Sequence, residues 1–297
     1  MSVVVAGSAN VDLTVTGRRL PSPGETVAAD GYEETAGGKG LNQAVAAARA
    51  GAEVSFFYAV GRDSGAGFLA DFLAQEPLRT HPTTTSAPTG RAFIEVDADG
   101  HNSIMVVGGA NNALEEWPDP SIEDAIAQSY FLVLQQEVSS TLNIRLAALA
   151  NKLDTRVVLT PAPVENMSPT ILSFTDILIL NEHEASLLGG HADPRLAGAM
   201  LSAGKTLILT RGASGATLFR SGEPVADFES PRVRAKDTTG AGDCFVGNFI
   251  AHKVTGASDD EAMNWACHAA ALSVTRLGAA QSMPSRDELS DYLQKGS

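Results

Sequence analysis

The stretch YFLVLQQEVSSTLNIRLAALANKLDTRVVLT, residues 130–160, contains a complete strand–helix–strand pattern. Its two ends, Tyr130–Leu134 and Val157–Thr160, are apolar or β-branched runs that are typical of buried strands, whereas Thr141–Lys152 between them is rich in alanine and leucine and predicts a helix. A connection of this kind joins two parallel strands through a right-handed crossover, with the helix lying on the sheet. The stretch therefore predicts an α/β fold.

The same alternation continues on both sides of this stretch. Further strands are predicted at Val3–Ala6, Ser55–Ala59, Ile177–Leu180 and Leu207–Thr210. Further helices are predicted at Asn42–Ala50, Gly65–Gln75 and Pro194–Ala203. Repeated alternation favours a doubly wound, mainly parallel sheet with helices on both faces. The sequence shows no internal repeat and no linker rich in Pro, Gly or Ser, so we expect one domain over residues 1–297.

Two segments do not follow this alternation of strands and helices. Residues 14–34 are polar and extended, and Arg91–Val107 has the pattern of a β-hairpin with its turn at Asp97–Gly100. We expect the two segments to pair into a small second sheet, inserted in the domain as a lid over the active site. Alternate residues of the hairpin point to opposite faces, so a ligand beneath the lid can cover only half of its apolar side chains. A second copy of the same lid is the simplest cover for the other half, which predicts a homodimer joined through the lids.

Composition narrows the partners and the compartment. The formal net charge of −14 argues against nucleic acid and against an anionic membrane surface. No apolar run approaches the roughly 18 residues that a membrane crossing needs, and the first residues read as a strand rather than a signal peptide. The two cysteines, Cys244 and Cys267, have no metal-binding spacing and fit a reducing compartment. We expect a cytoplasmic protein.

The most informative chemistry lies in the sequence Asp237-Thr238-Thr239-Gly240-Ala241-Gly242-Asp243, which precedes a helical pattern. Glycines at a helix start let backbone N–H groups approach an anion, and the helix dipole favours negative charge there. An aspartate in the same turn suits phosphoryl transfer, because it can take the proton of the attacking hydroxyl. Taken alone, Asp243 could equally be a helix-capping acid.

The whole motif resembles the C-terminal signature of the ribokinase-like family of sugar and nucleoside kinases. The N-terminal signature of that family is matched by Gly37-Gly38-Lys39-Gly40-Leu41-Asn42-Gln43-Ala44, and its middle motif by Asn181-Glu182-His183-Glu184. Order and separation agree, so the resemblance spans essentially the whole chain. It implies that Asp243 is the catalytic base and that Gly240, Ala241 and Gly242 form an anion hole for the transferred phosphoryl group.

A sugar site is expected near the first strand. Asn10 and Asp12 are two residues apart, so in an extended backbone their side chains share a face and offer donors and acceptors to adjacent hydroxyls. By itself the pair fits turn chemistry equally well. The resemblance assigns sugar binding to Asn10, Asp12, Gly38, Lys39, Asn42, Glu137 and Asp243.

The resemblance also implies sites for ATP and two cations. ATP is expected at Asn181, Thr210, Gly212, Gly215, Gly242 and Cys267. Mg²⁺ is expected at Asn181 and Glu184, through water, since oxygen ligands and retained waters suit this ion. K⁺ is expected at Asp237, Thr239, Ser273, Arg276, Gly278 and Ser282. Cys267 departs from the more polar residue usual near the adenine, which puts the nucleotide preference in doubt.

Other nucleotide enzymes and a zinc site are excluded by missing residues. The chain has no Gly-x₄-Gly-Lys-Ser/Thr loop and no Gly-x-Gly-x-x-Gly after its first strand, and Glu182-His183-Glu184 lacks the second histidine of a zinc motif. The predicted reaction is phosphorylation of a pentose by ATP at its primary hydroxyl, D-ribose giving D-ribose 5-phosphate. The alternatives are a kinase for another sugar or a nucleoside, and a non-catalytic sugar-binding sensor.

Overall fold

A large sheet forms the centre of the fold within residues 2–295, which are the residues that the computed structural model describes. Its strands, in spatial order, are β13 (Glu223–Phe228), β12 (Ala216–Arg220), β11 (Thr206–Thr210), β10 (Ile177–Asn181), β9 (Arg156–Thr160), β8 (Ser129–Gln135), β1 (Ser2–Ala6), β4 (Glu53–Val60) and β5 (Arg79–Thr84). The strands from β11 to β5 run parallel, and β12 and β13 add antiparallel strands at one edge. The predicted mainly parallel sheet is confirmed.

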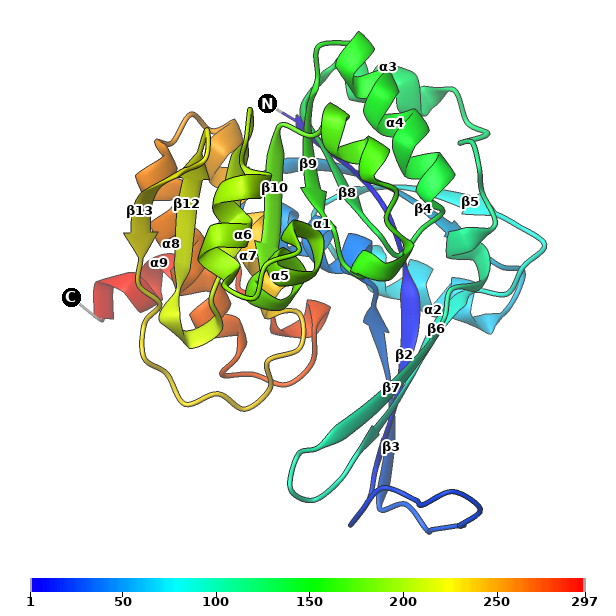
Figure 1. Cartoon of the computed structure of the whole chain (residues 1–297). Coiled ribbons are helices and arrows are strands. Elements are labelled where there is room, and N and C mark those ends of the chain that lie inside the picture. Colours follow the sequence, from blue (N-terminus) through cyan, green and yellow to red (C-terminus); the bar gives the residue numbers. More distant parts are fainter. Residues whose placement is uncertain (1, 296–297) are drawn as a thin grey trace.

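Helices cover both faces of this sheet (Figure 1). They are α1 (Lys39–Arg49), α2 (Ser64–Leu73), α3 (Ser121–Ala127), α4 (Ser140–Lys152), α5 (Glu182–Gly189), α6 (Pro194–Leu201), α7 (Ala241–Val254), α8 (Asp259–Ser273) and α9 (Arg286–Lys295). Alternate side chains of β1 enter two separate cores: Val3 and Val5 pack with α1, α7 and α8, while Val4 and Ala6 pack with α3 and α4. Burial on both faces explains why the inner strands are continuous apolar runs.

The helix after the Gly-Ala-Gly turn begins three residues earlier than the sequence pattern suggests. We expected it from Cys244, but α7 starts at Ala241, with Gly240 as its N-cap in the left-handed region (φ 73°). A residue with a Cβ is strained at that backbone conformation. Gly242 and Asp243 therefore lie inside the first turn of α7, and not before it.

A second, smaller sheet projects from the body of the molecule (Figure 1). Its strands, in spatial order, are β3 (Gly31–Gly37), β2 (Asn10–Thr16), β6 (Gly90–Val96) and β7 (Asn102–Val107). The pair β2–β6 is parallel, whereas β2–β3 and β6–β7 are antiparallel. The expected second sheet is confirmed, and its strands extend beyond the predicted segments because β2 begins at Asn10 and β3 continues to Gly37.

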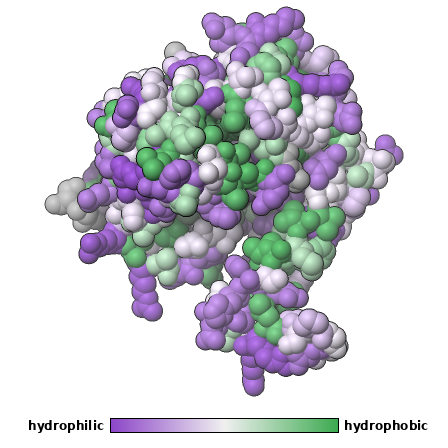
Figure 2. Space-filling model, in the orientation of Figure 1, coloured by the Kyte–Doolittle hydropathy of each residue, from purple (hydrophilic) through white to green (hydrophobic). Residues whose placement is uncertain are grey.

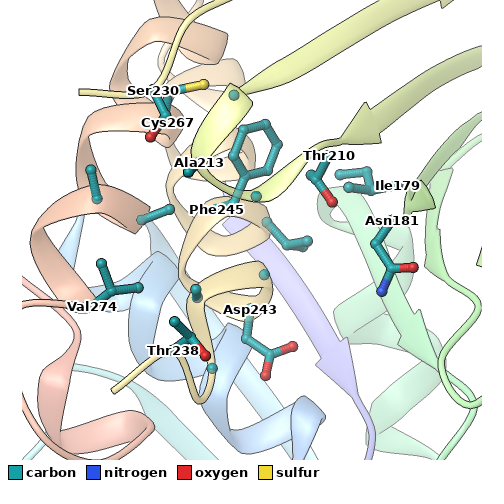
Figure 3. A pocket seen from close by; sticks show the side chains of 18 of the residues that line it. Ile179, Asn181, Thr210, Ala213, Ser230, Thr238, Asp243, Phe245, Cys267 and Val274 are labelled. Carbon is teal, nitrogen blue, oxygen red and sulfur yellow. The ribbon is translucent and has the colours of Figure 1, made fainter. Parts of the chain in front are cut away.

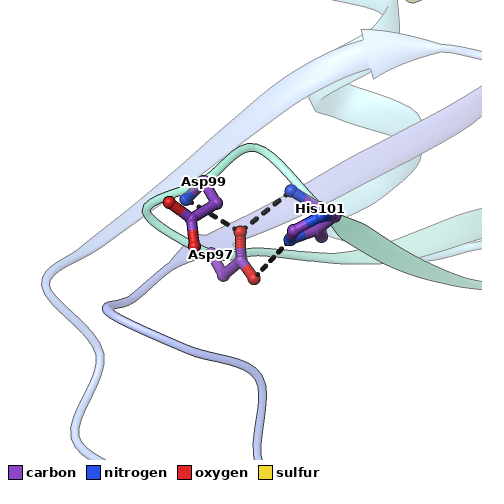
Figure 4. Close-up of side chains that lie close together, drawn as sticks. All are labelled: Asp97, Asp99 and His101. Carbon is purple, nitrogen blue, oxygen red and sulfur yellow. Dashed lines mark hydrogen bonds and ion pairs between the residues drawn. The ribbon is translucent and has the colours of Figure 1, made fainter.

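The tip of the β6–β7 hairpin is held by one carboxylate. Asp97 Oδ1 accepts hydrogen bonds from the backbone N–H groups of Asp99 and His101, both at 2.9 Å, and Asp97 Oδ2 lies 3.0 Å from Nδ1 of His101 (Figure 4). Aspartate commonly stabilises a turn in this way. These hydrogen bonds of the turn explain why the side chains of Asp97, Asp99 and His101 lie close together.

The hairpin leaves apolar side chains in water. Ile104, Met105, Val106 and Val107 of β7 are all exposed, and Met105 keeps 66% of its surface accessible. Figure 2 shows hydrophobic residues on the projecting sheet.

None of the helices in the described part of the chain combines the length and the hydropathy that a membrane crossing requires.

Candidate active site

An elongated cavity of ≈710 Å³ opens at the carboxyl ends of β10 and β11 and at the start of α7. This edge is where open parallel sheets place their ligands. The predicted site residues that line it are Lys39, Asn181, Glu184, Thr210, Gly212, Gly215, Gly240, Ala241, Gly242, Asp243 and Cys267. The structure thus brings the expected base, anion-hole, nucleotide and magnesium residues around one space.

The two ends of this cavity differ in chemistry. Figure 3 shows Cys267 and Ala213 at one end and Asp243 at the other, with Asn181 on the opposite wall. Val246 of α7, Ala270 and Ala271 of α8, and Val274 just after α8 add apolar lining to the cavity. An apolar end that leads to a polar end suits a molecule with a flat base at one side and phosphates at the other.

Asp243 is buried at the polar end, where two amides contact its carboxylate. Asn42 Nδ2 donates to Oδ2 at 3.0 Å, and Gln43 Nε2 donates to Oδ1 at 2.9 Å. Burial raises the pKa of Asp243, and the charge of Lys39 together with these two hydrogen bonds opposes that rise. The side chain makes no cap contact at the start of α7, so the capping interpretation of Asp243 is wrong.

Lys39 lies among three carboxylates. Burial lowers the pKa of Lys39, but the negative charges of Asp243, Glu137 and Glu184 outweigh it, so the pKa lies above the ordinary value. Glu137 is held in turn, because its Oε2 accepts from the backbone N–H of Lys39 at 2.9 Å and from Ser8 Oγ at 2.6 Å. The polar end therefore carries a fixed positive charge beside the candidate base.

A buried polar set continues from this end toward the small sheet. Asp12, on β2, has a pKa raised to about 7 by burial and by the nearby charge of Glu137. Asp12 Oδ1 and Asn42 Oδ1 are buried and have no hydrogen-bond partner. Asn10 Oδ1 accepts from Asn111 Nδ2 at 2.7 Å. Buried acceptors without partners are costly unless a ligand supplies donors, so these atoms mark a binding site for a polar molecule.

Asn181 and Glu184 form a capping box at the start of α5. Glu184 accepts from the backbone N–H and from Nδ2 of Asn181, both at 2.9 Å, and the N–H of Glu184 donates to Oδ1 of Asn181 at 2.9 Å. Both side chains line the main cavity while serving as this cap. The arrangement fits a metal contact through water, which leaves the cap intact.

Sequence comparison assigns the family. The signature of pfkB family carbohydrate kinases matches residues 1–286. The chain belongs to the pfkB family of carbohydrate kinases. The predicted enzyme class is thereby confirmed.

Relatives within the family agree over the full length of the chain. A ribokinase from Haemophilus influenzae is 39% identical, with 99% of this chain and 98% of the relative covered. A ribokinase from Mus musculus is 34% identical, over 97% of this chain and 93% of the relative. The solved structure of Arabidopsis thaliana ribokinase complexed with ribose and ATP has a TM-score of 0.89 and 32% identity, and covers 99% of this chain and 98% of the other.

The residues expected at a potassium site of this pfkB family member are only partly brought together. Asp237 Oδ1 accepts from the N–H of Thr239 and Oδ2 from the N–H of Gly278, both at 2.9 Å. The hydroxyls of Ser273 and Ser282 donate to carbonyls of their own segments. Arg276 pairs with Glu288 at 2.9 Å. Asp237 thus links the turn before α7 to the segment after α8, but within residues 2–295 no hydrogen bond or ion pair joins it to Ser273, Arg276 or Ser282.

A second cavity of ≈320 Å³ adjoins the first. Lys39, Ala162 and Glu184 line both, and Glu137, Val106 and Leu187 complete much of the second one. Val106 belongs to the small sheet and Leu187 to α5, so this cavity separates the small sheet from the body of this pfkB family member. His183 lines it as an exposed residue.

Sequence reasoning missed three residues that support this site. Asn111 bonds Asn10, Ser8 bonds Glu137, and Gln43 bonds Asp243. Gln43 lies inside the N-terminal signature and Ser8 lies two residues before Asn10, but no role was predicted for either side chain. Asn111 gave no signal, because it is about a hundred residues from Asn10 along the chain.

Proposed function

We propose that this chain transfers the γ-phosphoryl group of ATP to the primary hydroxyl of D-ribose, which yields D-ribose 5-phosphate and ADP. The observation that carries the proposal is the position of Asp243. Its buried carboxylate lies where the elongated cavity meets the buried polar set around Asn42. The full-length relatives named ribokinase, one of them solved with ribose and ATP, support the choice of substrates.

Ribose binds the buried polar set. Asp12 Oδ1 and Asn42 Oδ1 accept hydrogen bonds from its hydroxyls, which supplies the donors that these atoms lack in the free protein. Asn10 and Glu137 complete the polar walls, and Gly38 and Lys39 contribute backbone and charge at the start of α1.

Asp243 is the general base. It accepts the proton of the primary hydroxyl while the hydroxyl oxygen forms a bond to the γ-phosphorus and the bond from that phosphorus to the ADP oxygen breaks. The two amide donors and the charge of Lys39 oppose the effect of burial on its pKa, and so keep the carboxylate available as a base.

The N-terminus of α7 is the anion hole. The Ala241 N–H donates to the Thr238 carbonyl at 3.2 Å, so it is partly engaged. Within residues 2–295, no such bond is found for the N–H groups of Gly242 and Asp243, and both residues line the cavity. Gly240, Ala241 and Gly242 remain the proposed anion-hole residues.

ATP occupies the elongated cavity, with its base beside Cys267 and its phosphates toward Asp243. Thr210, Gly212 and Gly215 form the wall at the end of β11, and Asn181 lies opposite. Asn181 and Glu184 would hold Mg²⁺ through water, and this ion supplies positive charge to the phosphates. Asp237, Thr239 and Gly278 form the best connected part of the proposed K⁺ site, with Ser273, Arg276 and Ser282 offering further oxygen atoms.

The small sheet acts as a lid, and two copies of the chain pair through it. Residues that face each other across neighbouring strands point to the same side, so Ile104 shares the face of Asp12 while Met105 and Phe93 share the opposite face. The first face closes over the sugar. The second leaves Met105 and Phe93 exposed, and a second copy of this chain covers them.

We also place the protein in the cytoplasm, since both cysteines are free.

A screen of acceptors tests the proposed reaction. ADP release is measured with pentoses, hexoses and nucleosides at saturating ATP, and ribose is expected to give the highest kcat/KM. A hexose or a nucleoside with a higher kcat/KM would replace ribose as the substrate. Ribose binding by calorimetry without ADP release would favour a sugar-binding sensor.

A further inference from the structure

A chain of side-chain amides leads from the sheet to the carboxylate of Asp243. Gln135, the last residue of β8, donates from Nε2 to Oε1 of Gln43 at 2.7 Å. Gln43, on α1, donates from Nε2 to Oδ1 of Asp243 at 2.9 Å. Its second N–H points to Thr160 Oγ1 at 3.4 Å. Gln43 and Gln135 are essentially inaccessible to water, so the chain lies inside the protein.

The carboxylate of Asp243 decides which end of the Gln43 amide meets it, and Gln135 contacts the other end. An amide has one accepting and one donating end. Because an ionised carboxylate only accepts, Gln43 has to present Nε2 to Asp243, and its Oε1 then accepts from the Gln135 amide N–H group. The reverse orientation would place two oxygens against each other at Asp243 and two N–H groups against each other at Gln135.

Gln135 is packed against the backbone of Gly7. A Cβ built at Gly7 would lie 2.0 Å from Gln135 Oε1, so the amide rests directly on the backbone of this glycine. Gln135 Oε1 is buried and has no hydrogen-bond partner. The fold therefore tolerates an unsatisfied acceptor in order to keep this amide in place, and such an acceptor is costly in a protein interior.

We infer that Gln43 is a positioning residue for the proposed base, and that the hydrogen bond from Gln135 holds its amide in place. It holds Asp243 Oδ1 in a fixed direction and stabilises the ionised carboxylate, while Asn42 holds Oδ2. The inference rests on the proposed function, in which Asp243 takes the proton of the sugar hydroxyl.

The charged groups around Asp243 set the direction of the expected effect. Lys39, on α1, lowers the pKa of Asp243, and Glu137, after β8, raises it. The thiol of Cys244 is its neighbour on α7, and burial raises the pKa of that thiol to about 12, so it stays neutral. Removing the Gln43 donor leaves Lys39 and Asn42 alone against burial, so the pKa of Asp243 rises and more of the base is protonated at neutral pH.

The test compares the pH dependence of kcat in the wild type, Gln43→Met, Gln135→Met and the double variant. Gln43→Met keeps the volume of the side chain and removes the donor. We expect the acidic limb of its profile to move up by about one pH unit, as the loss of a hydrogen bond to a charged group implies, with the KM for ATP little changed. Gln135→Met should move the limb in the same direction by less, and the double variant by no more than Gln43→Met, because both act through one contact.

Gln136→Met is the matched control. Gln136 is equally buried and adjacent in sequence, but its amide has no hydrogen-bond partner and is not connected to Asp243. This variant should keep the wild-type pH profile. Folding of every variant is checked by its affinity for ADP.

Two outcomes overturn the inference in different ways. A Gln43→Met variant that binds ADP normally and keeps the wild-type acidic limb shows that Gln43 does not position the base. If Asp243→Asn retains wild-type turnover, the proposed base itself is wrong, and the result for Gln43 is then irrelevant to catalysis. A shifted limb in Gln43→Met and Gln135→Met, with Gln136→Met unchanged, supports the inference.

Discussion

The substitution Asp12→Asn should raise the stability of the fold and lower its affinity for sugar, so it separates these two properties. Burial and the charge of Glu137 raise the pKa of Asp12 from 3.8 to about 7. The ionised carboxylate is therefore held in the fold against a cost, and one of its oxygens has no partner in the free protein. Asparagine has the same shape but no charge, so it removes this cost.

The sign and the size of the effect follow from the two pKa values. Below pH 3.8 the carboxyl is protonated in the folded and the unfolded chain, and the substitution changes little. Between pH 3.8 and about 7 the unfolded chain loses the proton and the fold retains it, so the stability of the wild type falls as pH rises. Above that window the full cost is present, on the order of 4 kcal/mol from about three pKa units. The asparagine amide also needs a partner for its N–H groups, so this is an upper bound.

The assay is urea unfolding at pH 5, 6.5 and 8, each with and without ribose. Asp12→Asn should be more stable than the wild type at pH 8, and the difference should shrink toward pH 5. Added ribose should stabilise the wild type and have little effect on the variant, since ligand stabilisation requires affinity for the folded state. Asp71→Asn, at an exposed aspartate on α2, is the control and should show no such pH dependence. If Asp12→Asn were less stable than the wild type at pH 8, the reasoning would be refuted.

The remaining predictions concern catalysis, ions and assembly. Asp243→Asn should lower kcat by about 10²–10⁴-fold. Its ribose binding, measured by calorimetry, should not be lost. If the variant kept more than about a tenth of wild-type turnover, Asp243 would not be the base. Turnover should be higher in potassium than in sodium or a bulky organic cation at constant ionic strength, because an ion beside Asp237 would stiffen the turn before α7; equal rates would refute the potassium site. The KM for ribose should fall as pH rises through about 7, since sugar hydroxyls donate best to the ionised Asp12, and a flat profile between pH 6 and 8 would contradict this. Met105→Glu should convert a dimer to a monomer in light scattering, whereas Ile104→Glu should mainly raise the KM for ribose; a wild-type monomer at micromolar concentration would refute the dimer.

Residue patterns were sufficient for the inner part of the fold. Val3–Ala6, Val157–Thr160 and Leu207–Thr210 are buried on both faces of the sheet, so they are apolar up to a final threonine in the last two and can be recognised without any tertiary knowledge. The edge strand β5, Arg79–Thr84, was not predicted. It is polar, contains Pro82 and is largely exposed, so it carries no strand pattern of its own and depends on β4 for its structure.

The sequence by itself determined the chemistry of the site: a carboxylate in a Gly-Ala-Gly turn, an amide–carboxylate pair at a helix start, and two polar residues in an extended segment. Side-chain type and local spacing decide such features, and both can be read along the chain. Only the tertiary structure decided which groups meet. The contact of Gln43 with Asp243 joins residues 200 positions apart, and that of Asn111 with Asn10 joins residues 101 apart. The raised pKa of Asp12 also depends on the tertiary structure. Asp12 lies on β2 and Glu137 follows β8, so Asp12 becomes buried near the charge of Glu137 only when folding brings these segments together.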